Sequence, residues 1–212
     1  MIDSRTLARL GLFGCALTAL LAAIGQVDPD PGLDHAALTV SDFAVHDRGG
    51  ATDVAMIVYG LSAWCLLPAL RGARLPRALL ALFGAAMLAA AIAPTDLGPL
   101  TATGYVHRYA SLLAFTALPV AALTLRPVTR AVRATALAAS GFALLMLASA
   151  TLADRRFIGA AERYLLLAEV LLLALLCLRV LAAERSTDEG PAWAVPVAGA
   201  RHGRPGLLRR PR

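Results

Sequence analysis

The 212-residue chain is 58% hydrophobic and only 16% charged, a composition that excludes an ordinary soluble globular domain. Its formal net charge is +6, but the basic residues are all arginine and are spread along the borders of apolar runs. The composition therefore predicts an integral membrane protein in contact with the lipid bilayer, with no nucleic-acid partner.

Six stretches are long and apolar enough to cross a bilayer, whose hydrocarbon core takes roughly 20 helical residues. In chain order they cover approximately residues 6–25, 53–70, 77–93, 105–125, 134–152 and 162–183. Lipid offers the backbone no hydrogen-bond partner, so each span is predicted to be a helix. The predicted fold class is all-α: a polytopic transmembrane helix bundle of six spans, forming one domain over residues 1–183.

The positions of the arginines predict the orientation of this bundle. With the N-terminus in the cytoplasm, 15 of the 20 arginines fall in inner segments. The outer segments hold the other five: Arg48, Arg108, Arg155, Arg156 and Arg163. Cytoplasmic loops of membrane proteins carry the excess of positive charge, so both termini are predicted to be cytoplasmic and the protein to lie in the cell (cytoplasmic) membrane.

The first outer loop, residues 26–52, is long for a compact membrane domain. The sequence DPDPG predicts a rigid turn, and LDHAALTVSDFAVH, which contains Ser41 and Asp42, predicts a short helix or an interfacial segment. A loop of this length indicates a functional segment or a lid, and the alternative is a solvated connector.

The junction between the third and fourth spans places an acid and an imidazole beside apolar runs. Pro94 is expected to end the third helix, because a proline pushes the preceding residue out of the helical region. Thr103 is a plausible N-cap for the fourth helix, which puts His107 one turn inside and on the bundle side. We expect Asp96 to lie within hydrogen-bond or one-water reach of His107.

The sixth span carries charges that a membrane helix rarely tolerates. Glu162 and Glu169 are seven residues apart, about two turns, so they share a face that neighbouring Arg163 extends. Charges inside spans usually face the protein interior and are candidate site residues. The structural alternative is a Glu169 that is protonated or hydrogen-bonded to a hydroxyl of another helix, for which the candidates are Thr18, Ser62 and Ser140.

The predicted topology gathers these polar groups at one outer rim. A histidine with carboxylates can act as acid and base near neutral pH. The competing interpretation is a set of ion pairs that fix the helix ends: Asp96–Arg108, Asp154–Arg155 and Glu162–Arg156. The sequence has no close histidine or cysteine cluster, so no metal or cofactor is expected.

The stretch AAIAPTDLGPLTATGYVHRYASLLAFTALPVAALTL resembles the Pro-Thr-Asp and Gly-x-x-His core of the domain of unknown function 998 family. The resemblance extends over roughly residues 6–183 and implies a bacterial or archaeal membrane protein of about six spans. It implies a polar signature of Asp96 and His107, and further polar positions at Ser41, Asp42, Glu162 and Arg163. The activity of this family is unassigned, so the resemblance adds to the fold and the site but not to the reaction.

Three hypotheses for the function follow from these residues. The leading one is a membrane protein whose rim binds a small ligand, a lipid headgroup or a partner; its candidate residues are Ser41, Asp42, Asp96, His107, Glu162, Arg163 and Glu169. The second is a membrane-embedded hydrolase or lipid-modifying enzyme that uses His107 with Asp96 or Glu162. The third is a proton-coupled transporter in which Glu169 is the relay.

The chain changes in composition after the sixth span. Residues 184–212 are rich in proline, glycine and arginine and have few bulky apolar side chains. This composition predicts a disordered cytoplasmic tail, and its arginines are expected to contact anionic lipid.

Overall fold

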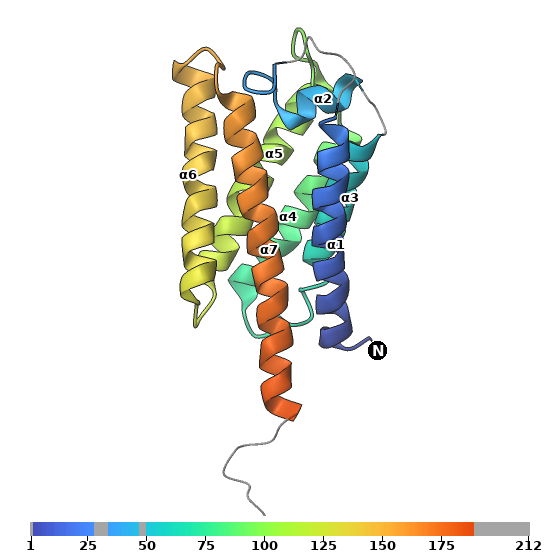
Figure 1. Cartoon of the computed structure of the whole chain (residues 1–212), viewed down its shortest axis with the longest axis vertical. Coiled ribbons are helices and arrows are strands. Elements are labelled where there is room, and N and C mark those ends of the chain that lie inside the picture. The colour runs from blue at the N-terminus through green and yellow to red at the C-terminus, as the bar shows by residue number, and fades with distance from the viewer. Residues whose placement is uncertain (1, 28–33, 47–49, 189–212) are drawn as a thin grey trace, which may run out of the picture.

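The computed structural model describes residues 2–27, 34–46 and 50–188 (Figure 1). In this part of the chain the regular secondary structure is entirely helical, which confirms the predicted all-α class. The helices are α1 (Ser4–Gly25), α2 (Val40–His46), α3 (Ala51–Trp64), α4 (Arg74–Ile92), α5 (Ala102–Thr124), α6 (Arg130–Leu152) and α7 (Ile158–Asp188). The last helix continues beyond residue 183, where the tail was predicted to begin, and residues 189–212 lie outside the described residues.

Five of these helices, α1, α4, α5, α6 and α7, are long and apolar enough to cross a membrane. Their outward faces carry large apolar side chains that pack against nothing in the bundle. Phe13, Leu144 and Leu167, for example, are each about two-thirds exposed. Apolar surface on this scale would be unfavourable in water, so the protein is a multi-pass membrane protein whose helices contact lipid.

The second predicted span ends earlier than expected, because α3 stops at Trp64 after 14 residues. Pro68 has no N–H to donate to the Trp64 carbonyl, and its ring would clash with that carbonyl in a continuous helix. The Leu67 N–H instead donates to Trp64 at 3.1 Å, in a series of tighter turns that continues through Leu70. Residues 53–70 therefore form a helix and a turn-rich extension rather than one long helix.

Figure 1 shows the bundle with its N-terminus and the last turns of α7 at the same, lower end. The short helix α2 lies across the upper end, near the end of α1, the beginning of α7 and the α4–α5 turn. We call this the α2 end. The most extensive packing joins α4 to α5, α6 to α7, and α1 to α3. The pairs α4–α5 and α6–α7 are joined by short connections, which make neighbouring helices antiparallel, whereas α1 and α3 pack together across the longer segment that contains α2.

The crossing of α3 and α4 depends on two glycines. A Cβ added at Gly60 would lie 2.7 Å from the backbone oxygen of Gly84, a distance that real Cβ atoms essentially never show. The two backbones are therefore in direct contact, which is the close packing that small residues permit in membrane helices. Beside this crossing, the rings of Tyr59 and Phe83 pack edge to face with centroids 4.9 Å apart.

At the α4–α5 junction the end of α4 agrees with the prediction from the sequence, and the beginning of α5 differs from it. Ala93 is extended, with φ −96° and ψ 105°, and α4 ends just before it, as the following Pro94 predicted. The N-cap of α5 is Thr101 and not Thr103: the Thr101 hydroxyl accepts the Gly104 N–H at 3.2 Å.

Candidate functional site

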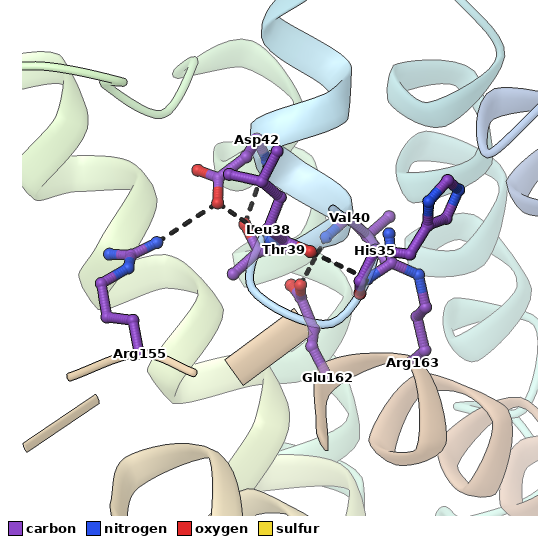
Figure 2. Close-up of polar contacts among 8 residues, drawn as sticks. All are labelled: His35, Leu38, Thr39, Val40, Asp42, Arg155, Glu162 and Arg163. Carbon is purple, nitrogen blue, oxygen red and sulfur yellow. Dashed lines mark hydrogen bonds and ion pairs between the residues drawn. The ribbon is translucent and has the colours of Figure 1, made fainter. Parts of the chain in front are cut away.

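α2 has only seven residues, and a helix this short is marginally stable by itself. Its first turn is stabilised by a capping box. The Asp42 N–H donates to the Thr39 hydroxyl at 3.0 Å, and the Thr39 N–H donates to the Asp42 carboxylate at 2.8 Å. The same Asp42 oxygen forms an ion pair with Arg155 at 3.2 Å (Figure 2). This ion pair, and not Asp154–Arg155, connects the α6–α7 turn to α2.

Glu162, from the first turns of α7, reaches the beginning of α2. Its Oε2 accepts the Val40 N–H at 2.6 Å, and the side chain is only 3% exposed. The first N–H groups of a helix have no partner within that helix and carry partial positive charge, so a carboxylate is stabilising there. Glu162 therefore binds a helix end and not Arg156, the ion-pair partner that the sequence suggested.

Arg163 holds the segment that precedes α2. Its Nη1 donates to the backbone oxygens of His35 at 2.6 Å and Leu38 at 2.8 Å (Figure 2). Its Nη2 donates to the Gln26 side chain at 2.5 Å. The guanidinium also lies 5.1 Å from the centroid of the Phe43 ring, a cation–π geometry. One side chain thus connects the end of α1, the loop and α2.

The loop also caps α7. The Ala36 carbonyl accepts the N–H groups of Gly159 at 2.9 Å and Ala160 at 3.2 Å. A Cβ at Gly159 would lie 2.7 Å from the His35 oxygen and closer still to that of Leu38, so only glycine allows this approach. We call Thr39, Asp42, Arg155, Glu162 and Arg163 the clasp. Its charged groups bind one another and the backbone, and together they fix residues 34–46 on α7.

Asp96 and His107 have separate partners. The Asp96 carboxylate accepts the Thr101 N–H at 2.7 Å and the Thr101 hydroxyl at 3.1 Å. Within the described residues no hydrogen bond joins it to His107, and none joins His107 to Glu162, so Asp96 and His107 do not form the direct hydrogen bond that was one form of the predicted contact. A Cβ at Gly104 would overlap the Asp96 carboxylate, which places this carboxylate over the first turn of α5.

His107 is buried on the bundle side of α5, as predicted. Its Nδ1 lies 2.9 Å from the Ala90 oxygen and 2.7 Å from the Ala93 oxygen, so this nitrogen carries the proton and donates to the last turn of α4. The last carbonyls of a helix lack partners within it, and His107 supplies one. The ring also lines a small cavity of about 10 Å³, roughly the room that one water needs, beside Ser41 and Asp53.

A larger cavity of about 220 Å³ lies among α1, α3 and α7, on the side of α2 that faces the bundle. We call it the α1–α7 cavity. Its walls are almost entirely apolar, and Gln26, Val40 and Arg163 line it next to the clasp. The farthest lining residues from α2 include Thr18 on α1 and Tyr59 on α3. The clasp therefore closes one end of an apolar cavity.

The chain matches one protein family over most of its length. A family model described as "Protein of unknown function (DUF998)" matches residues 12–179, which covers most of α1 through α7. The chain belongs to the DUF998 family. No curated protein and no solved structure matches it. This match confirms the predicted family and leaves the activity open.

Glu169 of this DUF998 protein is fully buried, and neither carboxylate oxygen has a hydrogen-bond partner among the described residues. The hydroxyls that the sequence suggested as partners do not reach it. Ser62 and Ser140 donate to carbonyls of their own helices, at 2.6 and 2.9 Å, and the Thr18 hydroxyl is itself without a partner.

The predicted site residues of this DUF998 protein thus lie in three separate places in the structure. Asp42, Glu162 and Arg163 come together in the clasp, whereas Asp96 and His107 fix the α4–α5 junction and Glu169 lies deeper. In the described ranges no group of three or more histidine, cysteine or acidic side chains is arranged to hold a metal ion. Sequence reasoning did not single out Tyr59, which is buried beside the cavity and whose hydroxyl has no partner among the described residues; an aromatic hydroxyl inside a predicted span was the available signal.

Proposed function

We propose that this protein spans the cytoplasmic membrane six times, with both termini inside, and binds a single-chain amphipathic lipid in the α1–α7 cavity. The alternation of α1, α3, α4, α5, α6 and α7 supports six crossings, and the N-terminus and the last turns of α7 lie at the same end (Figure 1). The excess of arginines at that end supports the orientation. On this proposal residues 184–212 form a cytoplasmic tail that contacts anionic lipid.

The orientation is tested by single cysteines in a variant whose native cysteines are replaced. Gly98, in the α4–α5 turn, and Gly72, before α4, both have open space around the Cβ position. Cysteine at Gly98 is expected to react with a membrane-impermeant thiol reagent on whole cells, and cysteine at Gly72 only after lysis. The opposite result would invert the topology. Gly32, a third position suited to this test from the sequence, lies outside the described residues.

The cavity itself carries the proposal of lipid binding. Its volume of about 220 Å³ far exceeds the roughly 10–15 Å³ that one water needs, and it is smaller than the roughly 300–1,000 Å³ of drug-sized pockets. One acyl chain fits this range better than a two-chain phospholipid does. The walls include Ala19 of α1 and Leu167 of α7, both exposed on the lipid-facing surface. A membrane lipid can therefore enter sideways, between the two helices.

The candidate site residues acquire different roles in this proposal. Arg163 lines the cavity directly, while Asp42 and Glu162 hold the segment that closes its end. Asp96 and His107 support the neighbouring helix junction. Residues 34–46 are then the lid that the long first loop suggested, and the clasp holds this lid shut against α7.

Filling the cavity tests the proposed function. Ala22→Phe puts a ring among the lining residues, whereas Ala138→Phe adds the same ring on an exposed face of α6. Native mass spectrometry of the detergent-solubilised protein with octadecan-1-ol as the probe is expected to show one bound molecule per chain for the parent and for Ala138→Phe. Binding should be lost in Ala22→Phe. Equal binding by all three proteins, or none by the parent, would refute the proposal.

A further inference from the structure

His107 uses only one of its two ring nitrogens to bind α4. Its Nδ1 donates to the Ala90 and Ala93 carbonyls, at 2.9 and 2.7 Å, so the proton of the neutral ring is on Nδ1. The other nitrogen, Nε2, is then a hydrogen-bond acceptor, and within the described residues nothing donates to it. Buried polar groups without partners are rare in native proteins, so this nitrogen calls for an explanation.

The Nε2 atom differs from the other buried polar atoms that lack partners. The Tyr59 hydroxyl and both Glu169 carboxylate oxygens are fully enclosed by protein atoms, so no ligand can reach them. Nε2 of His107 is not enclosed in this way, although the His107 side chain is only 5% exposed. The ring lines the small cavity of about 10 Å³ described above. We take the accessible surface of Nε2 to face this cavity.

This cavity, which we call the α2–α5 cavity, lies where α2 covers the ends of α3, α4 and α5. Ser41, Ala44 and Val45 line it from α2, and their spacing of three and four residues places them on one face of that helix. Val40, on another face of α2, lines the α1–α7 cavity instead. The two cavities are therefore separate sites under the same short helix.

Three polar residues from three helices line the α2–α5 cavity: Ser41 of α2, Asp53 of α3 and His107 of α5. No hydrogen bond joins Ser41 to His107 within the described part of the chain. A molecule that bridges these residues must therefore offer donors to the His107 Nε2 and the Asp53 carboxylate, and an acceptor to the Ser41 hydroxyl. A carboxylate accepts up to about four hydrogen bonds, so Asp53 can bind such a molecule beside its other partners.

Water meets these requirements. It has two O–H donors and an acceptor oxygen, and a buried water needs roughly 10–15 Å³ of such space and two to four polar partners. An anion would face two acceptors. In the described ranges no group of three or more histidine, cysteine or acidic side chains is arranged to hold a metal ion.

We infer that the α2–α5 cavity binds one water molecule, which donates to His107 Nε2 and to the Asp53 carboxylate and accepts from the Ser41 hydroxyl. This water connects α2 to α3 and α5. The clasp holds residues 34–46 on α7, and the water holds another face of the same segment on the helices beside it. The inference does not depend on lipid binding in the α1–α7 cavity.

Nitrogen-15 NMR of the detergent-solubilised, histidine-labelled protein tests the water directly. The chain has four histidines, and the His107 resonances are assigned by their loss in His107→Asn. The parent is expected to show a protonated Nδ1, an Nε2 resonance displaced from that of a free acceptor, and a magnetisation-transfer cross-peak between Nε2 and water. Because this measurement uses the parent protein, it does not depend on the folding of a variant.

Ala44→Val fills the cavity with two methyl groups, and Ala138→Val adds the same groups on an exposed face of α6. Ala44→Val is expected to lose the water cross-peak and to move the Nε2 resonance to the position of a free acceptor. Ala138→Val should keep both signals. The Nδ1 resonance should be unchanged in the two variants, which shows that His107 still binds the last turn of α4.

Hydrogen–deuterium exchange tests the connection to α2. Ser41→Ala removes one hydrogen bond to the water, so the Val40 amide, which bonds to Glu162, should exchange about two- to tenfold faster. Ser140→Ala is the control, since the Ser140 hydroxyl bonds to a carbonyl of its own helix. Equal exchange in the two variants would leave the water in place and overturn its connection to α2.

Three NMR results would overturn the water itself. A free-acceptor Nε2 resonance without a water cross-peak in the parent means that the cavity is dry. A resonance that moves in Ser41→Ala but not in Ala44→Val means that Ser41 donates to His107 directly. A resonance that moves when a chelator such as EDTA is added means that a metal ion occupies the site.

Discussion

Gly60→Ala is expected to destabilise the bundle by about 1–3 kcal/mol, the range typical of overpacking in a well-packed interior. The added methyl group would lie 2.7 Å from the Gly84 oxygen and 3.2 Å from the Met87 Cβ. A backbone oxygen cannot rotate away as a flexible side chain can, so α3 and α4 must separate. α3 has only 14 residues and packs on its other side against α1, and its displacement from α4 would also disturb the Tyr59–Phe83 pair.

The matched control is Gly141→Ala, in the middle of α6. A Cβ there meets nothing within 4 Å, so the same methyl group is added without a clash. Alanine also has the higher helix propensity, which makes this change neutral or stabilising by up to about 1 kcal/mol. Equilibrium unfolding in mixed micelles compares the two variants with the parent. If both substitutions shift stability by the same amount, α3 and α4 are not in backbone contact.

The helical bundle could be predicted from the sequence because lipid forces the backbone to satisfy its own hydrogen bonds. An apolar run of sufficient length then has one structural solution, and all five helices capable of spanning coincide with predicted spans. The boundaries depend on single residues. Pro94 correctly predicted the end of α4, and Pro68 held the same information about α3, but the apolar residues around it concealed that break.

The candidate site could be predicted only as a collection of residues. Asp42, Glu162 and Arg163 were placed at one rim by topology alone, and the structure brings them together. Their partners are backbone groups as much as side chains, and Val40 and Glu162 are 122 residues apart in the chain. Opposite charges in the sequence suggested an ion pair between Glu162 and Arg156. The Glu162 carboxylate instead binds the beginning of α2, whose unpaired N–H groups carry a partial positive charge.

The cavity could not be predicted at all from residue types. Thr18 was identified as a possible partner for Glu169, since a hydroxyl in a span needs an acceptor. The structure shows that it has none among the described residues, and that Tyr59 shares this state. Whether a polar group in a membrane helix is satisfied depends on how three helices pack, and hydropathy carries no information about the space left between them.

Arg163→Met is expected to release residues 34–46 from α7 while the bundle stays folded. Methionine retains much of the apolar stem of arginine but none of the donors that bind His35, Leu38 and Gln26. Hydrogen bonds from a charged group contribute about 1.5–3 kcal/mol when buried, and Arg163 is partly exposed. We therefore expect a combined loss of about 3 kcal/mol, equivalent to roughly 100-fold more frequent local opening.

Hydrogen–deuterium exchange measures this opening at three amides whose acceptors lie across the interface. The Val40 N–H bonds to Glu162, and the N–H groups of Gly159 and Ala160 bond to Ala36, so each is protected only while the segment is docked. All three should exchange faster in Arg163→Met. Arg156→Met is the matched control, since it removes the same charge from an exposed side chain in the α6–α7 turn.

The comparison of Arg163→Met with Arg156→Met decides whether Arg163 holds residues 34–46 on α7 or is only a charge near the surface. Faster exchange at all three amides in Arg163→Met alone means that one guanidinium holds the segment that closes the α1–α7 cavity. Equal exchange in the two variants would mean that the segment is held by Glu162 and by the N-terminus of α7 without Arg163. In the first case the variant should also release octadecan-1-ol faster than the parent does, because the end of the cavity next to α2 is then open more often.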